Sequence, residues 1–244
     1  MKAVVLAAGY ATRLYPLTLD RPKALLPVGG KPMLEHLLDR LEGVDGLDEI
    51  HVVTNSKFAE AFREWAEDAG RGVRILDDGT ADEEGKLGAI GDLELAIRSE
   101  AIDDDLLVLA GDNLFSESFA PFAAFGREKR APALGVYDVD DLDAVRRYNA
   151  IELDEENRVV FFEEKPERPA STLIGIALYF YPSSSLRLVG EYLTEGNNPD
   201  QPGRLVEWLY PRTPVYAWRV PGRWYDVGSK ETLEEADRAF GGGG

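Results

Sequence analysis

The sequence predicts an α/β fold with a mixed, mainly parallel central sheet flanked by helices, in a Rossmann-like arrangement. Three observations support this prediction. Over residues 2–113, short apolar runs alternate with amphipathic segments, which is typical of right-handed strand–helix–strand crossovers. Those apolar runs are rich in valine and leucine, as expected for strands buried on both faces. After residue 131, strand-like runs follow one another with few crossovers, which indicates a β-rich second part.

Each element of the first part has a physical signal. The run KAVVLAA over 2–8 is continuously apolar and predicts a buried strand. Residues 32–44 carry apolar side chains at a helical period, and Pro32 suits the first turn of a helix. The remaining elements alternate in the same way: a strand over 49–55, a helix over 57–70 that Gly70 ends, a strand over 72–76, a helix over 86–99 and a strand over 105–113.

The second part is predicted mainly as strands. They span 131–139, 148–154, 157–166, 172–182 and 213–220, with helices near 183–193, 203–210 and 230–240. Neither a linker nor an internal repeat separates the two parts, so residues 1–240 are predicted to form a single domain. The glycines at 241–244 have no side chains that could pack, and we expect a flexible tail there.

The charge is distributed unevenly along the chain. The protein has 45 acidic and 27 basic residues, a net charge of −18, yet residues 1–32 carry five Lys or Arg and one Asp. An acidic protein repels nucleic acid, and the excess acid is typical of a solvated surface or of adaptation to salt or heat. A concentrated positive segment in such a chain predicts a small anionic ligand.

Several classes of site are excluded by composition. The chain has no cysteine and only two histidines, so disulfides, thiolate metal sites and a zinc centre are not expected. No apolar run approaches the ~18 residues that span a membrane, and the N-terminal run predicts a strand rather than a signal peptide. These features suit a cytoplasmic enzyme. A homo-oligomer is compatible with the sequence.

Small residues follow the first predicted strand in the turn AAGYAT. Such a loop brings backbone N–H groups close to a ligand and can form a nest for phosphate oxygens. A tight strand-to-helix turn has a similar composition, and neither the G-x-G-x-x-G pattern nor a P-loop occurs. Ligands of parallel sheets bind beyond the carboxyl ends of the strands, where LDDGT and GDN also lie.

A longer pattern is more specific. Residues 6–27 read L-A-A-G-x-x-T-R-L-x-P-L-T-x-x-x-P-K-x-L-x-P, and LAGDN, FFEEKP and GRWYDVGSKETLEEA follow at 109–113, 161–166 and 222–236. This ordered set resembles the sugar-1-phosphate nucleotidylyltransferases, a family that includes glucose-1-phosphate thymidylyltransferase. The resemblance implies a GT-A-like nucleotidyltransferase fold, with a nucleotide-binding half over 1–130 and a β-rich sugar-phosphate-binding half over 131–240.

The implied reaction transfers a nucleoside monophosphate from a nucleoside triphosphate to a sugar 1-phosphate and releases pyrophosphate. The resemblance assigns catalytic roles to Arg13, at the β- and γ-phosphates, and to Lys23, between the α-phosphate and the sugar phosphate. It assigns Mg²⁺ to Asp112 and Asp226, whose hard carboxylates suit that ion. Arg21 and Lys31 match less specific positions.

The resemblance also implies two sets of substrate contacts. The nucleotide-binding set is Leu6, Ala8, Gly9, Ala11, Thr12, Asp78, Gly88 and Asp112. The sugar-phosphate-binding set is Asn149, Glu163, Lys165 and Gly175. The choice between Glu163 and Glu164 is ambiguous, because strand alternation would place them on opposite faces. Glu163 aligns with the sugar-hydroxyl acceptor of the family, and Lys165, on the same face, would meet the sugar phosphate.

Some positions depart from the family pattern. Ala11 replaces a usual glycine, so its backbone is expected to avoid conformations that only glycine adopts easily. Asn149 also replaces a glycine, which places a side chain where the sugar usually passes the backbone. Asp78 or Thr80 lies in the loop from which a glutamine commonly faces the base, so UTP, dTTP and CTP all stay open.

Two alternatives remain open, and a third is rejected. The altered Asn149 motif keeps open a cytidylyl- or uridylyltransferase that acts on a non-hexose phosphate such as inositol phosphate or phosphocholine. A non-catalytic sensor of nucleotide sugars would keep the fold without turnover. Residues Asp103 to Asp105 could suggest the D-x-D of a glycosyltransferase, but they precede a strand and are better explained as a solvated turn.

Overall fold

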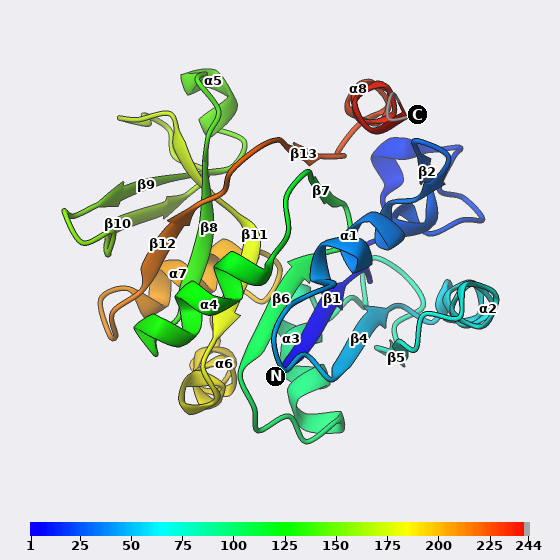
Figure 1. Ribbon diagram of the computed structural model, residues 1–244, viewed down its shortest axis with the longest axis horizontal. Helices are drawn as coiled ribbons and strands as arrows, with labels where there is room; N and C mark the ends of the chain where they lie inside the picture. Colours follow the sequence, from blue (N-terminus) through cyan, green and yellow to red (C-terminus); the bar gives the residue numbers. More distant parts are fainter. Residues whose placement is uncertain (242–244) are drawn as a thin grey trace.

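The computed structural model describes residues 1–241 and places seven strands in one central sheet, in the order β12-β8-β11-β6-β1-β4-β5 (Figure 1). These strands are β1 (Lys2–Leu6), β4 (Glu49–Thr54), β5 (Arg74–Asp77), β6 (Leu106–Ala110), β8 (Ala133–Asp138), β11 (Leu173–Tyr181) and β12 (Tyr216–Arg219). The sheet draws strands from both parts of the sequence. Of the tail expected at 241–244, residues 242–244 lie outside the described residues, and Gly241 is instead the last residue of helix α8 (Lys230–Gly241).

The strand directions give a mixed, mainly parallel sheet, which confirms the predicted fold class. Strand β1 pairs in parallel with both β4 and β6, and β4–β5 and β8–β12 are parallel pairs as well. Strand β11 runs antiparallel to β6 and to β8, and so joins the two parallel groups into one sheet. The carboxyl ends of β1, β5 and β6 therefore meet at one edge, which is where ligands of such sheets bind.

Helices cover both faces of the sheet because side chains alternate along each strand. Ala3 and Val5 of β1 face a core formed with α1 (Met33–Leu41), α2 (Ala59–Ala69) and α4 (Ala120–Lys129). Val4 faces the opposite core, formed with α3 (Ala89–Ser99), α6 (Arg187–Thr194) and α7 (Pro202–Leu209). Figure 1 shows α1 and α4 in front of the sheet and α3 and α7 behind it. In the described part of the chain, no helix has the length and apolar character needed to cross a membrane.

Three small antiparallel pairs surround the ligand-binding edge. They are β9 (Asn149–Leu153) with β10 (Val159–Glu164), β7 (Asn113–Phe115) with β13 (Trp224–Asp226), and β2 (Pro27–Val28) with β3 (Lys31–Pro32). The β7–β13 pair matters most for the site, because its register sets Asp226 opposite Asn113. The remaining short helices are α5 (Leu142–Val145) and the 3-10 turns η1 (Thr12–Leu14), η2 (Lys23–Leu25) and η3 (Ser183–Ser185).

Helix α4 is the main element that the sequence analysis did not predict. Its segment contains Pro121 and Gly126, which usually mark turns. Pro121 lies in the first turn, where a missing N–H costs nothing. Gly126 has a packing role, because a Cβ atom added there would lie 2.3 Å from the ring of Phe180 on β11. The glycine that looks like a helix breaker is what lets α4 approach the sheet closely.

Candidate active site

A cavity of about 540 Å³ lies at the carboxyl ends of β1, β5 and β6. Most of the residues predicted for the site line it, although they come from distant parts of the chain. They are Leu6, Ala8, Gly9, Ala11, Thr12, Arg13, Lys23, Asp78, Gly88, Asp112, Asn149, Gly175 and Asp226. Glu163 and Lys165 are the two predicted residues that do not line the cavity. Arg21 does not line it, and Lys31 pairs with Asp39 on α1.

The small-residue loop after β1 forms one wall of this cavity, and its backbone is fixed by side chains. Asn55 donates a hydrogen bond from Nδ2 to the carbonyl of Ala8 at 2.8 Å, and Thr18 donates from Oγ1 to the carbonyl of Ala11 at 2.8 Å. The expectation for Ala11 was wrong: this residue has φ 49° and ψ 42°, in the left-handed region. Its carbonyl also accepts from the N–H of Leu14 at 3.0 Å, so surrounding bonds hold a conformation that costs alanine about 1 kcal/mol.

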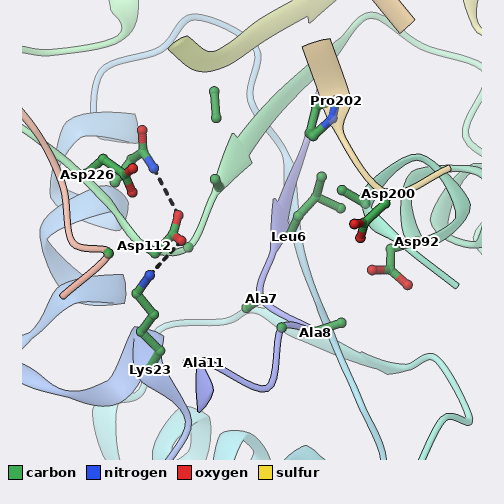
Figure 2. Close-up of a pocket in the computed structure, with 18 of the residues that line it drawn as sticks. Leu6, Ala7, Ala8, Ala11, Lys23, Asp92, Asp112, Asp200, Pro202 and Asp226 are labelled. Atoms are coloured by element: carbon green, nitrogen blue, oxygen red, sulfur yellow. Dashed lines mark hydrogen bonds and ion pairs between the residues drawn. The ribbon is translucent and has the colours of Figure 1, made fainter. Parts of the chain in front are cut away.

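Lys23 and Asp112 form the central polar contact. The Nζ of Lys23 donates to Oδ2 of Asp112 at 2.8 Å, and the Nδ2 of Asn113 donates to Oδ1 at 2.9 Å (Figure 2). Burial acts to raise the pKa of Asp112, but the charge and hydrogen bond of Lys23 outweigh it and leave that pKa below its usual value. Asp112 is therefore ionised at neutral pH and is held in a fixed orientation.

Asp226 has the opposite electrostatic environment. Burial and the charge of Asp112 raise the pKa of Asp226 to about 6, although Lys23 and Arg13 act to lower it. Figure 2 shows the side chains of Asp112 and Asp226 on the same side of the cavity. The adjacent Tyr148 has its pKa raised to about 12, first by burial and then by Asp226. Two carboxylates therefore lie near each other at this end of the cavity, and Lys23 contacts only Asp112 of the two.

Two neighbouring carboxylates are ligands suited to a divalent cation. Among the described residues there is no group of three or more His, Cys, Asp or Glu that could enclose a metal. A cation here would take two protein oxygens and complete its shell with water and phosphate oxygens, as Mg²⁺ commonly does. The donor set of Asp112 and Asp226 therefore fits Mg²⁺ better than a metal held entirely by protein.

The β-rich wall of the cavity contains a buried side-chain clamp. Asn149 on β9 donates from Nδ2 to the carbonyl of Gly175 at 2.8 Å, and its Oδ1 accepts from the N–H of Gly175 at 2.6 Å. Both polar ends of the amide are thus used to join β9 to β11. Asn149 was expected to reach into the space of the sugar, but these bonds turn its amide toward the sheet backbone instead.

Glu164, rather than Glu163, faces the cavity. The alternation expected for this strand is present, but in the opposite phase: Glu163 is exposed and Glu164 is half-buried beside Gly203. Burial raises the pKa of Glu164 to about 7, against the charges of Lys165 and Arg204. Lys165 was expected to share a face with Glu163 and to reach the cavity, but it lies after the end of β10 with φ 53° and is exposed.

Comparisons with known proteins agree with this geometry. A family model described as "Nucleotidyl transferase" matches residues 2–241. The chain belongs to the nucleotidyl transferase family. This result confirms both the resemblance found in the sequence and the predicted class of enzyme.

Individual members of the nucleotidyl transferase family match over nearly the whole chain. This chain is 30% identical to the UTP–glucose-1-phosphate uridylyltransferase AglF of Haloferax volcanii, and the alignment covers 98% of this chain and 96% of that protein. It is 27% identical to the bifunctional protein GlmU of Methanocaldococcus jannaschii, of which it spans only 54%. A solved structure of a putative glucose-1-phosphate thymidylyltransferase from Bacillus anthracis has a TM-score of 0.81 at 24% identity, over 100% of this chain and 96% of that one, which supports the fold.

The nucleotidyl transferase cavity also contains residues that sequence reasoning missed. Asp92, in the first turn of α3, and Asp200, before α7, line it opposite the Lys23–Asp112 pair (Figure 2). Lys86 pairs with Asp200 at 3.0 Å. A signal for Asp92 was present in the sequence, because an acid four residues after Gly88 interrupts an otherwise apolar helix face. Asp200 lies in a polar loop and carried no such signal.

Replacing Asn149 with alanine should destabilise this nucleotidyl transferase. The change removes two hydrogen bonds and leaves the buried N–H and carbonyl of Gly175 without partners, so we expect a loss of about 2–3 kcal/mol in the free energy of unfolding. Urea unfolding measures it. Thr172→Ala is the control, since its bond to Asp138 is exposed and its loss should cost about 0.5 kcal/mol. Equal losses for both variants would contradict the clamp.

Proposed function

We propose that this protein transfers UMP from UTP to the phosphate of a hexose 1-phosphate, with Mg²⁺ bound by Asp112 and Asp226. The observation that carries the proposal is the Lys23–Asp112 contact at 2.8 Å, beside Asp226 and at the edge where the small-residue loop follows β1. Uridylyl transfer to a hexose phosphate is suggested by relatives of that name, which are 30% and 32% identical.

The proposed reaction joins two anions. An oxygen of the sugar phosphate attacks the α-phosphorus of UTP, the bond from that phosphorus to the bridging oxygen breaks, and pyrophosphate leaves with the electron pair. Bound Mg²⁺ would supply charge neutralisation for the phosphates. No covalent intermediate on the protein is needed, so catalysis depends on alignment and on stabilising charge as it moves to the leaving group.

The chain supplies its own cations for these charges. Lys23 is half-buried, with 15% of its side chain exposed, so the charge it presents to the α-phosphate and to the incoming phosphate is poorly screened by water. Arg13 is exposed at the mouth of the cavity, where its planar guanidinium can bind the departing pyrophosphate through two oxygens. The proposed nucleotide half is residues 1–130, and Glu164 and the β9–β11 wall face the sugar.

Initial rates of pyrophosphate release test the proposal. UTP, dTTP, CTP, GTP and ATP are each paired with glucose 1-phosphate, mannose 1-phosphate, inositol phosphate and phosphocholine, with and without Mg²⁺. The expected result is the highest kcat/KM for UTP with a hexose 1-phosphate, and no turnover after chelation. Preference for a non-hexose phosphate would replace the proposed acceptor. Nucleotide binding without turnover of any pair would favour the sensor.

A further inference from the structure

Asp92 is the most deeply buried acid in the described part of the cavity wall. Only 5% of this residue is exposed, and Oδ1 of its carboxyl group has no hydrogen-bond partner among residues 1–241. It lies in the first turn of α3, where its N–H donates to the carbonyl of Gly88 at 2.8 Å. An unpartnered buried carboxyl oxygen is costly, so its persistence at a cavity wall points to a ligand that completes it.

Asp78 supports Asp92 from the end of β5. The N–H and the hydroxyl of Thr80 both donate to Oδ1 of Asp78, at 2.7 and 2.8 Å, which fixes this side chain. The carboxyl groups of Asp78 and Asp92 lie within hydrogen-bonding contact. Two carboxyl groups can make such a bond only when one of them carries a proton.

The surrounding charges favour retention of that proton. Burial, the charge of Asp78 and the charge of Asp200 raise the pKa of Asp92 to about 7. The one cation that lines this end of the described cavity, Lys86, pairs with Asp200. The other ionisable groups there are Glu83, which is exposed, and Tyr10, whose hydroxyl lies 3.3 Å from that of Thr80. The pair is thus neither neutralised by a lysine nor part of a three-ligand metal site among the described residues.

On the basis of the proposed function, we propose that Asp92, held by Asp78, recognises the hydrogen-bonding edge of the nucleotide base. The two carboxyl groups act as a pair that shares one proton. The pair then presents one O–H donor and one acceptor oxygen. Uracil offers the matching edge, with the O4 acceptor beside the N3–H donor. The position fits, because Asp92 and Asp200 lie across the cavity from the proposed phosphate end, with Leu6, Ala7 and Ala8 between (Figure 2).

Loss of the shared proton would change which bases fit. Two ionised carboxylates present acceptors only, and O4 of uracil would then face an acceptor. Guanine has two adjacent donors, N1–H and N2–H, and still matches. We therefore expect affinity for UTP to fall relative to GTP as the pH rises above 7. The ratio is informative because both nucleotides carry the same triphosphate, whose own ionisation cancels.

Calorimetric dissociation constants of UTP and GTP between pH 6.5 and 8.5, without sugar phosphate, test this proposal. For the wild type, the ratio of the UTP constant to the GTP constant should rise about tenfold. Asp92→Asn keeps a donor and an acceptor, so its ratio should stay constant, with UTP affinity within about threefold at pH 6.5. Asp92→Leu removes both and should weaken UTP binding about tenfold or more. Asp103→Asn, exposed beyond the far end of α3, is the charge-matched control and should behave as the wild type.

A pH-independent ratio in the wild type, or UTP binding to Asp92→Leu as tight as in the wild type, would overturn the proposal. Thermal unfolding confirms that each variant is folded. The test measures binding and not turnover. A protein that binds UTP but releases no pyrophosphate would contradict the proposed function, while its dissociation constants would still decide the role of Asp92. Binding of neither UTP nor GTP at any pH would overturn both.

Discussion

A Lys23→Met variant is expected to lose about 10³-fold in kcat, with a smaller change in KM. Methionine keeps the apolar stem of the side chain and removes only the charge, which is held 2.8 Å from Asp112. Removal of one preorganised electrostatic group from a poorly solvated site commonly costs 10²–10³ in rate. The position of Lys23 between two proposed phosphate groups puts the effect at the upper end. Steady-state pyrophosphate release measures it.

The same substitution should also lower stability. It leaves Asp112 without its cationic partner and close to Asp226, so the free energy of unfolding should fall by about 1–2 kcal/mol, a value reduced because 36% of the Asp112 side chain is exposed. Lys31→Met is the matched control: Lys31 pairs with Asp39 away from the cavity, and its loss should leave kcat within twofold. A kcat within tenfold of the wild type for Lys23→Met would contradict the proposed role.

The predictable part of the fold was set by local patterns. Valine- and leucine-rich runs located β1, β4 and β6, because strands covered on both faces are rich in apolar residues. Helix α4 was missed because its packing depends on Gly126 facing Phe180, a contact between distant residues. Strand β13 was missed for the same reason: three residues pair with β7 only because the chain returns to that edge.

The residues of the site also divide into those that local motifs predict and those that they do not. Arg13, Lys23 and Asp112 follow predicted strands within recognisable motifs, so sequence placed them near the cavity. The phase of Glu163 and Glu164 is set by how β10 pairs with β9, which no local pattern specifies. The clamp between Asn149 and Gly175 needs two strands to be adjacent. A single sequence gives little information on which residues of separate elements will contact one another.

Asp226→Asn should make the protein more stable and nearly inactive. The carboxylate of Asp226 is charged at pH 7.5 although burial and Asp112 raise its pKa to about 6, so the folded state bears an unfavourable charge that asparagine removes. We expect a gain of about 1–2 kcal/mol in the free energy of unfolding without metal, and a fall in kcat/KM of about 10²-fold or more. Urea unfolding with chelator and initial rates measure the two effects.

Asp112→Asn is the informative comparison, because the two acids have opposite environments. The pKa of Asp112 lies below its usual value through Lys23, so its charge stabilises the folded state and its loss should destabilise by about 1 kcal/mol. Both variants should lose activity, and Mg²⁺ should raise the melting temperature of the wild type more than that of either variant. Two variants that both lower stability would show that Asp226 is a structural acid. If Asp226→Asn raises stability, Asp112→Asn lowers it and both lose activity, then Asp226 is retained because it binds a cation.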